Sequence, residues 1–384
     1  MVRIAVDLQM LAPGALNGGI KPLILRQVRR LREWHPGRFE FIFLVNQALA
    51  PELELAIPGC RLVCVSKRAE PLATRPGMRL SLRGRWALRQ ADLLYAPVWF
   101  SPFHSRRRPT IAMFADMLHR DHPEMLSGES ERLWREEIVK FSVRTAARIQ
   151  TISDTMVERI RQHYGVQTSR LLRTYPPREK LLESAPEGQA ARERSGFLYP
   201  ANSWPHKNHE RLLLAYSLYR QRAGTGAWPL VLTGHENPER KAVLEARARE
   251  LGLSAQHLQF CGFLGDREFA AIWEKTGALV FPSLYEGFGM PLIEAMNSRV
   301  PIAASGIPAT TEVAGDSALL FEPSDPASIA DAMFQMSSRP DLRAGLATRG
   351  AIRLQMFDDE KEIGTLAGAF QAAVQEFRSS KIAR

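Results

Sequence analysis

The chain of 384 residues contains little cysteine and no long apolar run. Its three cysteines, Cys60, Cys64 and Cys261, lack the spacing of zinc ligands and are too few for a disulfide framework, which indicates a reducing, cytoplasmic compartment. No apolar run approaches the roughly 18 residues of a membrane span. The first residues, MVRIAVDLQML, lack the long hydrophobic region and small-residue cleavage site of a signal peptide, so they are predicted to form a buried strand.

Basic residues are concentrated in one half of the chain. Residues 1–185 hold 30 Lys and Arg against 18 Asp and Glu, whereas residues 186–384 hold 21 against 23. An excess of base in one half suits an anionic membrane surface, a phosphorylated molecule or nucleic acid. A solvated basic surface without a partner is the plain alternative, and the charge alone does not decide between them.

Short apolar runs alternate with helical patterns in both halves, which predicts an α/β fold with two doubly wound parallel sheets. A chain of this length favours two domains. The first half supplies six runs of strand length: RIAVDLQM, FEFIFLV, CRLVCV, DLLYAPVW, TIAMFAD and RIQTIS. The second half repeats the alternation from GFLYPAN through WPLVLTG, HLQFCGFL, GALVFPS and VPIAAS.

The domain boundary is predicted in the polar stretch 176–195, where prolines and a glycine break regular structure. An N-terminal Rossmann-like domain is expected over 1–180 and a C-terminal one over 195–355. The last segment, 356–384, is helical in pattern, has no strand after it, and is predicted to cross back to the first domain. Ligands of such domains bind at the carboxyl ends of the strands, so we expect the two domains to face each other across a cleft.

Two acids flank a glycine-rich turn in the segment LYEGFGMPLIEAM, 284–296. Glu286 precedes the turn, and Glu294 lies in the helix that Pro291 is expected to start. Turn amides and the positive helix end form an anion site. Two hydroxyl acceptors on either side of an anion site fit a sugar nucleotide, with the diphosphate between the hexose and the ribose.

The segment resembles the E-x7-E signature of the retaining glycosyltransferases of family 4 (glycosyl transferases group 1), which have the GT-B fold. The resemblance spans nearly the whole chain. It continues through LNGGIKPLILRQVRRL, ADMLHRDHPEML, QTISDTMVERIRQHYGV, PHKNHERLLLAY and PATTEVAGDSALLFEP. It implies transfer of a hexose from a GDP- or UDP-linked sugar to a saccharide or lipid-linked acceptor in bacterial polysaccharide biosynthesis, with mannose favoured by the PHKN region.

The resemblance implies that the N-terminal domain, 1–180, is the acceptor side and that the C-terminal domain, 195–355, binds the nucleotide sugar. It also implies roles for individual residues. Glu294 would bind the ribose, Glu286 the transferred sugar and Lys207 the diphosphate of the leaving group. The predicted donor-binding set is Gly18, Gly19, Asn202, Lys207, Arg211, Gly234, Phe263, Glu286, Gly287, Phe288, Gly289, Met290 and Glu294. The predicted catalytic set is Glu286, Asp116, Lys207 and His119.

No cofactor or metal is expected, because the sequence contains no D-x-D motif and a cationic side chain and glycine turns can do a metal's electrostatic work. The resemblance implies a front-face mechanism with retention at the anomeric carbon, which needs no protein nucleophile. Two positions depart from the family pattern. Asn202 stands where an arginine is common, with Arg211 as a candidate replacement, and Ala115 stands where a histidine normally precedes Asp116. His119 is the candidate to replace that histidine.

A basic amphipathic segment, GMRLSLRGRWALRQ at 77–90, is a candidate for peripheral contact with anionic lipid on the inner face of the cytoplasmic membrane. Arg75, Arg79 and Arg83 form one helical row, and Leu82 and Trp86 form another. A solvated basic face over a packed apolar row is the plain alternative.

Other functions remain open on the sequence: a non-catalytic homologue of the family, a GT-B epimerase or phosphorylase, and a basic nucleic-acid-binding protein. The last is disfavoured because no nucleic-acid-binding module is recognised. The donor base, the acceptor, the linkage and the oligomeric state do not follow from the sequence.

Overall fold

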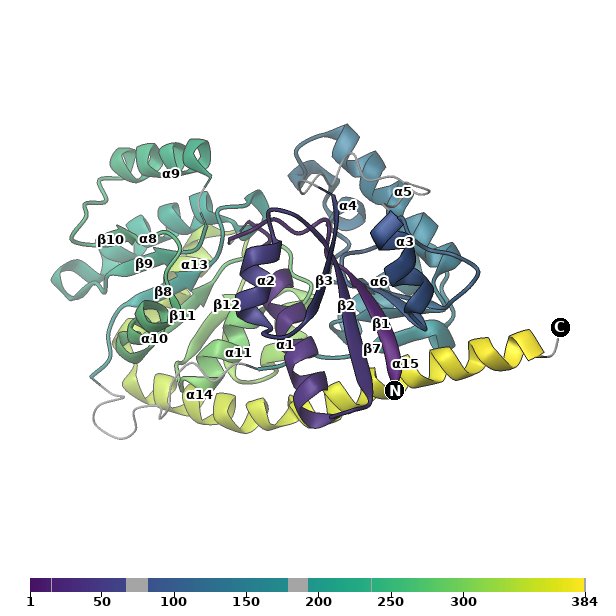
Figure 1. Ribbon diagram of the computed structural model, residues 1–384. Helices are drawn as coiled ribbons and strands as arrows, with labels where there is room; N and C mark the ends of the chain where they lie inside the picture. Colours follow the sequence, from purple (N-terminus) through teal and green to yellow (C-terminus); the bar gives the residue numbers. More distant parts are fainter. Residues whose placement is uncertain (15, 67–81, 179–192, 236, 383–384) are drawn as a thin grey trace. The chain divides into compact units, whose positions relative to one another are not determined.

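The computed structural model describes residues 1–14, 16–66, 82–178, 193–235 and 237–382. These residues divide into two compact units (Figure 1). Unit 1 comprises Met1–Pro177 and Asp358–Arg384, and unit 2 comprises Arg178–Phe357. Most of the predicted boundary segment 176–195 lies outside the described residues, as do Arg75 and Arg79 of the basic segment. Among the residues described, no helix combines the length and the apolar character required to cross a bilayer.

In its described part, unit 1 contains a seven-stranded parallel sheet in the order β3-β2-β1-β4-β5-β6-β7. The order reverses between β1 and β4, which is where parallel sheets of this kind usually bind ligands. The strands are β1 (Val2–Asp7), β2 (Phe39–Asn46), β3 (Arg61–Ser66), β4 (Leu93–Ala96), β5 (Thr110–Phe114), β6 (Arg148–Thr151) and β7 (Leu171–Arg173).

Helices cover both faces of this sheet. The helical elements of the unit are α1 (Ile20–Trp34), α2 (Ala50–Ala56), α3 (Leu82–Gln90), α4 (Leu118–Asp121), η1 (Pro123–Met125), α5 (Glu129–Thr145), α6 (Asp154–Tyr164), η2 (Thr168–Arg170) and α15 (Asp359–Ile382). Leu94 packs with Leu88 of α3, while the ring of the next residue, Tyr95, meets Phe370 of α15 edge-on at 5.2 Å. Consecutive strand residues point to opposite faces, so α3 and α15 lie on opposite sides of the sheet.

The last helix, α15, is anchored in unit 1 by apolar and polar contacts. Phe370 also meets Phe39 of β2 at 6.1 Å. The buried carboxylate of Glu362 accepts a 2.7 Å bond from Arg173 and a 3.0 Å bond from the backbone N–H of Tyr175. Figure 1 shows this helix in yellow. The structure therefore returns the C-terminal segment to the unit that contains the N-terminus.

Unit 2 holds a second parallel sheet, of six strands within its described residues, in the order β10-β9-β8-β11-β12-β13. Its strands are β8 (Phe197–Pro200), β9 (Leu230–Thr233), β10 (Leu258–Phe260), β11 (Ala278–Phe281), β12 (Ile302–Ser305) and β13 (Ala318–Phe321). Its helical elements are η3 (Pro205–Lys207), α8 (His209–Ala223), η4 (Gly224–Gly226), α9 (Pro238–Glu250), α10 (Asp266–Lys275), α11 (Met290–Asn297), α12 (Pro308–Ala314), α13 (Pro326–Ser338), α14 (Pro340–Arg353) and η5 (Leu354–Met356).

The two parallel sheets with alternating helices confirm the predicted α/β fold class. Every apolar run that was predicted to be a strand in either half contributes to a strand. The sequence pattern missed β7, in which only Leu171 and Leu172 are apolar, and β13, whose segment was singled out by resemblance alone.

Candidate active site

Lys207 and Glu286 come together in unit 2 although 79 residues separate them in the chain. Lys207 ends η3, in the connection after β8, and Glu286 lies in the turn after β11. These two strands are neighbours in the sheet, so both connections leave the same carboxyl edge. The Lys207 Nζ lies 2.6 Å from Glu286 Oε1, and the side chains are 15% and 11% exposed. Both partners of this ion pair are therefore largely screened from water.

Buried hydrogen bonds hold the two connections against each other. The Tyr199 hydroxyl donates to the Lys207 carbonyl at 2.7 Å and lies 3.0 Å from the Ser283 hydroxyl. The Leu284 N–H donates to the His206 carbonyl at 2.8 Å. Burial raises the pKa of Tyr199 well above its ordinary value, so this hydroxyl stays protonated and keeps its donor. The position of Lys207 is thus set by the backbone around it.

Asn208 fixes the start of α8 in the same way. It has a left-handed backbone with φ of 63°, and its side-chain amide donates to the Pro282 carbonyl at 2.9 Å and the Pro323 carbonyl at 2.8 Å. Its Oδ1 accepts a 2.6 Å bond from Arg211. The buried amide of Asn208 therefore ties the start of α8 to the residues that follow β11 and β13, and it also holds the guanidinium of Arg211.

The glycine turn adopts the conformation that its sequence predicts. Gly289 has a φ of 101° and precedes α11, in which Pro291 occupies the first turn. A Cβ atom on Gly289 would lie 3.0 Å from Leu292 Cδ1, so the site also has little room for a side chain. The ring of Phe288 is buried and meets Phe357 edge-on at 5.8 Å. Phe288 therefore presents backbone, and not its ring, to the surface of the turn.

The helix that follows carries the other two predicted residues of this segment. Met290 is the first residue of α11 and Glu294 lies in its second turn, both half-buried. Gly287, between Glu286 and Phe288, is buried. The whole segment 286–294 thus lies at the carboxyl edge of β11.

The remaining predicted donor residues of unit 2 follow β8, β9 and β10 at this edge. Asn202 accepts a 2.8 Å bond from the His235 N–H, and the Gly234 N–H donates to the Gly262 carbonyl at 2.8 Å. Gly234 has a φ of 128°, and a Cβ there would lie 2.6 Å from the Ala201 carbonyl, so only glycine fits. Phe263, next to Gly262, is exposed. The side chain of Asn202 therefore joins the connection after β8 to the one after β9. Its neutral amide adds no positive charge at the position where the family commonly has an arginine.

In unit 1, Gly18 and Gly19 lie directly before α1, and Gly18 has a φ of 55°. The neighbouring Lys21 is buried, and its ammonium donates to the carbonyls of Ala12 and Gly14 and pairs with Glu52. Sequence reasoning missed this residue, because a lysine in a helical pattern indicates a solvated side chain. Its role in the structure is to hold the β1–α1 connection that carries the two glycines.

Asp7, at the carboxyl end of β1, was also missed. It is buried, and its carboxylate accepts a 2.5 Å bond from the Ser101 hydroxyl and a 3.2 Å bond from the Gln9 N–H. Burial raises the pKa of Asp7 to about 7, partly offset by these bonds. A short polar side chain directly after a buried strand was the available signal.

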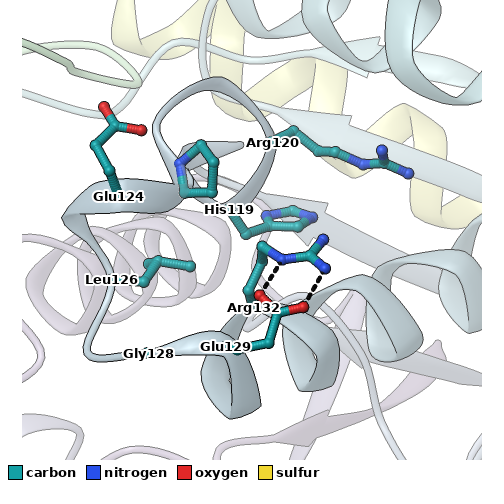
Figure 2. Close-up of a pocket in the computed structure, with 8 residues that line it drawn as sticks. His119, Arg120, Glu124, Leu126, Gly128, Glu129 and Arg132 are labelled. Atoms are coloured by element: carbon teal, nitrogen blue, oxygen red, sulfur yellow. Dashed lines mark hydrogen bonds and ion pairs between the residues drawn. The ribbon is translucent and has the colours of Figure 1, made fainter.

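His119, in α4, lies at the edge of a pocket of 520 Å³ in unit 1 (Figure 2). The residue is 2% exposed, and its Nε2 lies 2.9 Å from the Tyr164 hydroxyl and 3.6 Å from Glu136 Oε2. Burial lowers the pKa of His119 to about 4, against the opposing influence of Asp116 and Glu136. The imidazole is therefore neutral at pH 7 and bonded on one side, so a catalytic role stays a prediction.

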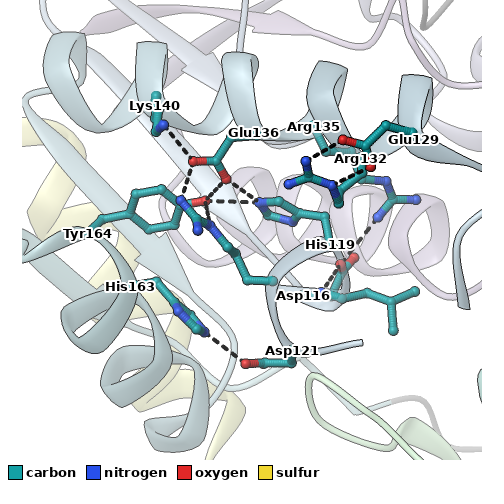
Figure 3. A network of polar contacts seen from close by, with 12 residues as sticks. Asp116, His119, Asp121, Glu129, Arg132, Arg135, Glu136, Lys140, His163 and Tyr164 are labelled. Carbon is teal, nitrogen blue, oxygen red and sulfur yellow. Dashed lines mark hydrogen bonds and ion pairs between the residues drawn. The ribbon is translucent and has the colours of Figure 1, made fainter. Parts of the chain in front are cut away.

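The partners of His119 form a larger polar network between α4, α5 and α6 (Figure 3). Glu136 accepts bonds from Tyr164 at 2.9 Å and Lys140 at 2.9 Å, and also pairs with Arg120. Burial acts to raise the pKa of Glu136, but these bonds lower it below the ordinary value. The network therefore holds His119 and Arg120, two of the residues that line the pocket.

Asp116 lies at the end of β5 and has two partners. Its Oδ1 accepts a 3.1 Å bond from the Leu118 N–H and lies 3.4 Å from Arg135 Nη1. The Arg135 guanidinium stacks over the ring of Trp99, 4.7 Å from its centroid. Trp99 has a φ of 57°, which is rare for a bulky residue and occurs often at functional sites. The carboxylate of Asp116 is thus held by α4 and by Arg135 of α5, and Trp99 in turn supports that guanidinium.

Comparison with known proteins supports a single interpretation of these features. Residues 184–353 match the family described as "Glycosyl transferases group 1". The chain is 26% identical to "O-antigen chain mannosyltransferase B" of Escherichia coli over 88% of this chain and 89% of that protein. Residues 184–353 therefore belong to the group 1 glycosyltransferases, and the chain is a glycosyltransferase.

A second relative of the glycosyltransferase matches it more closely over a shorter stretch. "Serotype-specific mannosyltransferase WbdA" of Escherichia coli is 38% identical over 125 residues, which are 32% of this chain and 15% of that protein. The chain therefore corresponds to nearly all of one relative and to a small part of the other.

Solved structures confirm the GT-B fold of the glycosyltransferase. Anabaena Alr3699/HepE, in complex with UDP and glucose, matches with a TM-score of 0.74 at 17% identity, over 97% of this chain and 100% of that one. WaaG, a glycosyltransferase involved in lipopolysaccharide biosynthesis, matches with a TM-score of 0.68 at 14% identity, over 96% of this chain and 99% of that one.

Proposed function

We propose that this glycosyltransferase transfers a hexose, with mannose favoured, from a GDP- or UDP-linked donor to a saccharide or lipid-linked acceptor in bacterial surface polysaccharide assembly. Two relatives support the sugar and the acceptor by their names. They are "O-antigen chain mannosyltransferase B" of Escherichia coli and "O-antigen chain mannosyltransferase RfbU" of Salmonella typhimurium, the latter 26% identical over 53% of this chain and 55% of that protein. The HepE structure, which contains UDP and glucose, supports a nucleotide-sugar donor. The observation that carries the proposal is the ion pair between Lys207 and Glu286 at the carboxyl edge of unit 2.

In this proposal the bound donor separates the ion pair, and each of its two side chains then binds a different group of the donor. Lys207 binds the diphosphate, Glu286 accepts hydrogen bonds from the hexose hydroxyls, and Glu294 binds the ribose. The bond from the anomeric carbon to the phosphate oxygen breaks, and the acceptor oxygen bonds to that carbon on the same face. The acceptor proton passes to the leaving diphosphate. Lys207 stabilises the charge that develops on this group, so no metal is required.

Thermal-shift measurements with GDP-mannose, UDP-glucose and ADP-glucose test the donor site. We expect one of these donors to raise the melting temperature of the wild type, and the Glu286→Ala variant to lose that shift. The matched control is Glu239→Ala, which removes an exposed carboxylate from α9. The proposal fails if no nucleotide sugar raises the melting temperature and Glu286→Ala behaves like the control. Turnover that falls on addition of EDTA would contradict metal independence.

We also propose that α3 places unit 1 on an anionic membrane surface. Its side chains Leu82 and Trp86 are 83% and 55% exposed, and three exposed arginines surround them: Arg83, Arg85 and Arg89. Exposed apolar side chains among cations are typical of helices that lie in a membrane interface. The described part of the segment therefore does not have its apolar row packed in the protein core.

Flotation with vesicles that contain anionic lipid at physiological salt tests this contact. We expect the wild type to float and the double variant Leu82→Ala/Trp86→Ala to remain at the bottom. Leu55→Ala is the control, because Leu55 is an equally exposed leucine on α2. Wild-type protein that stays wholly at the bottom would reject the membrane contact without affecting the donor proposal.

A further inference from the structure

The pocket beside His119 belongs to unit 1 alone and contains none of the residues proposed to bind the donor. It has a volume of 520 Å³, within the range of about 300–1,000 Å³ that is usual for small-molecule sites. Its lining comes from α4, η1, the connection between η1 and α5, and the first turn of α5. The side chains that matter here are His119, Arg120, Glu124, Leu126, Glu129 and Arg132.

The charges of this lining compensate one another. Arg132 donates to both oxygens of Glu129, one of these bonds being 2.7 Å long, and Arg120 pairs with Glu136 (Figures 2 and 3). The imidazole of His119 is neutral at pH 7, because burial lowers its pKa to about 4. The two arginines and two glutamates of the lining cancel in charge, so a phosphate or carboxylate gains no net attraction here. The pocket is therefore poorly suited to an anion.

The same groups suit a neutral molecule that carries many hydroxyls. The bonds to Glu129 use two of the five N–H donors of the Arg132 guanidinium, which leaves donors for a ligand. The carboxylates of Glu124 and Glu129 are well exposed and have further acceptor sites. A sugar hydroxyl both donates and accepts, so it can bond to such a pair without breaking it.

An apolar side chain completes the lining. Figure 2 shows Leu126 pointing toward the Arg132–Glu129 pair, with the ring of His119 above them. Binding pockets commonly combine apolar contact with a few fixed polar groups, and the C–H face of a hexose ring offers that apolar contact. The buried network of Tyr164 and Glu136 holds His119 and Arg120 in place before any ligand arrives.

We infer that this pocket of unit 1 binds a neutral saccharide unit of the acceptor, and not its phosphate. The inference rests on the proposed glycosyl transfer for the statement that the saccharide is an acceptor. Saccharide binding at the pocket can be measured without turnover. The site would select acceptors that already carry sugar, such as a growing chain, over a bare phosphorylated lipid.

Binding of mannobiose and mannotriose to the full-length protein, followed by saturation-transfer NMR and calorimetry, tests the inference. Leu126→Trp fills the pocket, and we expect it to weaken binding of both saccharides at least tenfold. Leu133→Trp introduces the same bulk at an exposed leucine of α5 that does not line the pocket, and it should bind as the wild type does. Arg132→Met removes the donors without filling the space and should also lose affinity, which guards against misfolding of the tryptophan variant.

Three results would overturn the inference. The first is that neither saccharide binds the wild type, and the second is that Leu126→Trp and Arg132→Met bind as tightly as Leu133→Trp does. The third is that inorganic phosphate competes with the saccharide and that Leu126→Trp abolishes phosphate binding. The donor measurement is independent, because a nucleotide-induced thermal shift is expected in all three variants. If no nucleotide sugar shifts the melting temperature of the wild type but the saccharides still bind, the proposed function is rejected and the pocket assignment stands.

Discussion

The Lys207–Glu286 pair of unit 2 and the His119 network of unit 1 differ in how many partners hold each charge. Lys207 and Glu286 face each other across two connections. In unit 1, Glu136 alone receives bonds from Arg120, Lys140 and Tyr164, and Tyr164 in turn holds His119. A ligand can replace one partner of a simple pair, whereas it would have to dismantle a shared network. We therefore assign chemistry to the pair and support of a binding surface to the network.

Removal of the cation from the pair gives the largest expected effect. Lys207→Met should lower turnover about 10²–10³-fold, because a charge that stabilises the leaving group is lost. Lys275→Met, which removes an exposed lysine from α10, should leave turnover unchanged. Steady-state kinetics with the donor identified by thermal shift measures both. Equal turnover in the two variants would remove the distinction drawn between the two regions.

A side chain at Gly234 should disturb the packing of the connection after β9, at the carboxyl edge of the sheet in unit 2. The Cβ of Gly234→Ala would overlap the Ala201 backbone, so we expect it to destabilise the protein by about 1–3 kcal/mol more than Gly252→Ala does. Gly252 has a φ of 67° with open space around it, and it controls for backbone strain alone. Urea denaturation of both variants gives the difference. Equal midpoints would show that the connection after β9 adapts freely.

Substitutions in the network of unit 1 should lower the stability of the protein and have little effect on turnover. Tyr164→Phe removes the hydroxyl between His119 and Glu136, and we expect a loss of about 1–3 kcal/mol in the free energy of unfolding. Tyr175→Phe removes an exposed hydroxyl at 3.3 Å from Asp154 and should cost less than about 0.5 kcal/mol. A large fall in kcat with unchanged stability in Tyr164→Phe would place this network in the chemistry.

The smallest effect at neutral pH is expected for His119→Gln, since His119 is neutral there in the folded protein. As the pH falls from about 6.5 toward 4, the unfolded chain binds a proton at His119 and the folded protein does not, so the wild type loses stability. The variant lacks this contribution. Urea denaturation at pH 7, 6 and 5 should therefore bring the two stability curves closer together, or make them cross, as the pH falls. Parallel curves would show that burial does not lower the pKa of His119.

The sequence predicted the strands well because each buried parallel strand is a short apolar run. β7 escaped because its two leucines lie between two arginines and form no longer apolar run, and β13 was not singled out as a strand. Motif resemblance singled out Lys207 and Glu286 separately, but their mutual pairing depends on β8 and β11 being neighbours. Tyr199 and Asn208 were not predicted, because their partners are backbone carbonyls that only the folded sheet brings close.

Unit 1 also shows where local pattern fails. Lys21 has the spacing of a surface residue, yet the β1–α1 connection folds over it and supplies carbonyl acceptors. His119 was considered as a replacement for a missing histidine on spacing alone. The structure adds its bond to Tyr164, which comes from a helix 45 residues away in sequence. Contacts of this range do not follow from any short window of sequence.

The position of helix α15 at the end of the chain determines the order in which the two units can fold during synthesis. The ribosome makes residues 1–177 first, yet the helix that covers Tyr95 and Phe39 of their sheet is made last, after all of unit 2. During synthesis, unit 2 can therefore close its core before unit 1 can, while one face of the earlier sheet waits for Phe370 and its neighbours. A fragment that stops at residue 177 would carry that bare apolar face permanently. Separate production of unit 1 thus requires fusing residues 358–384 to it.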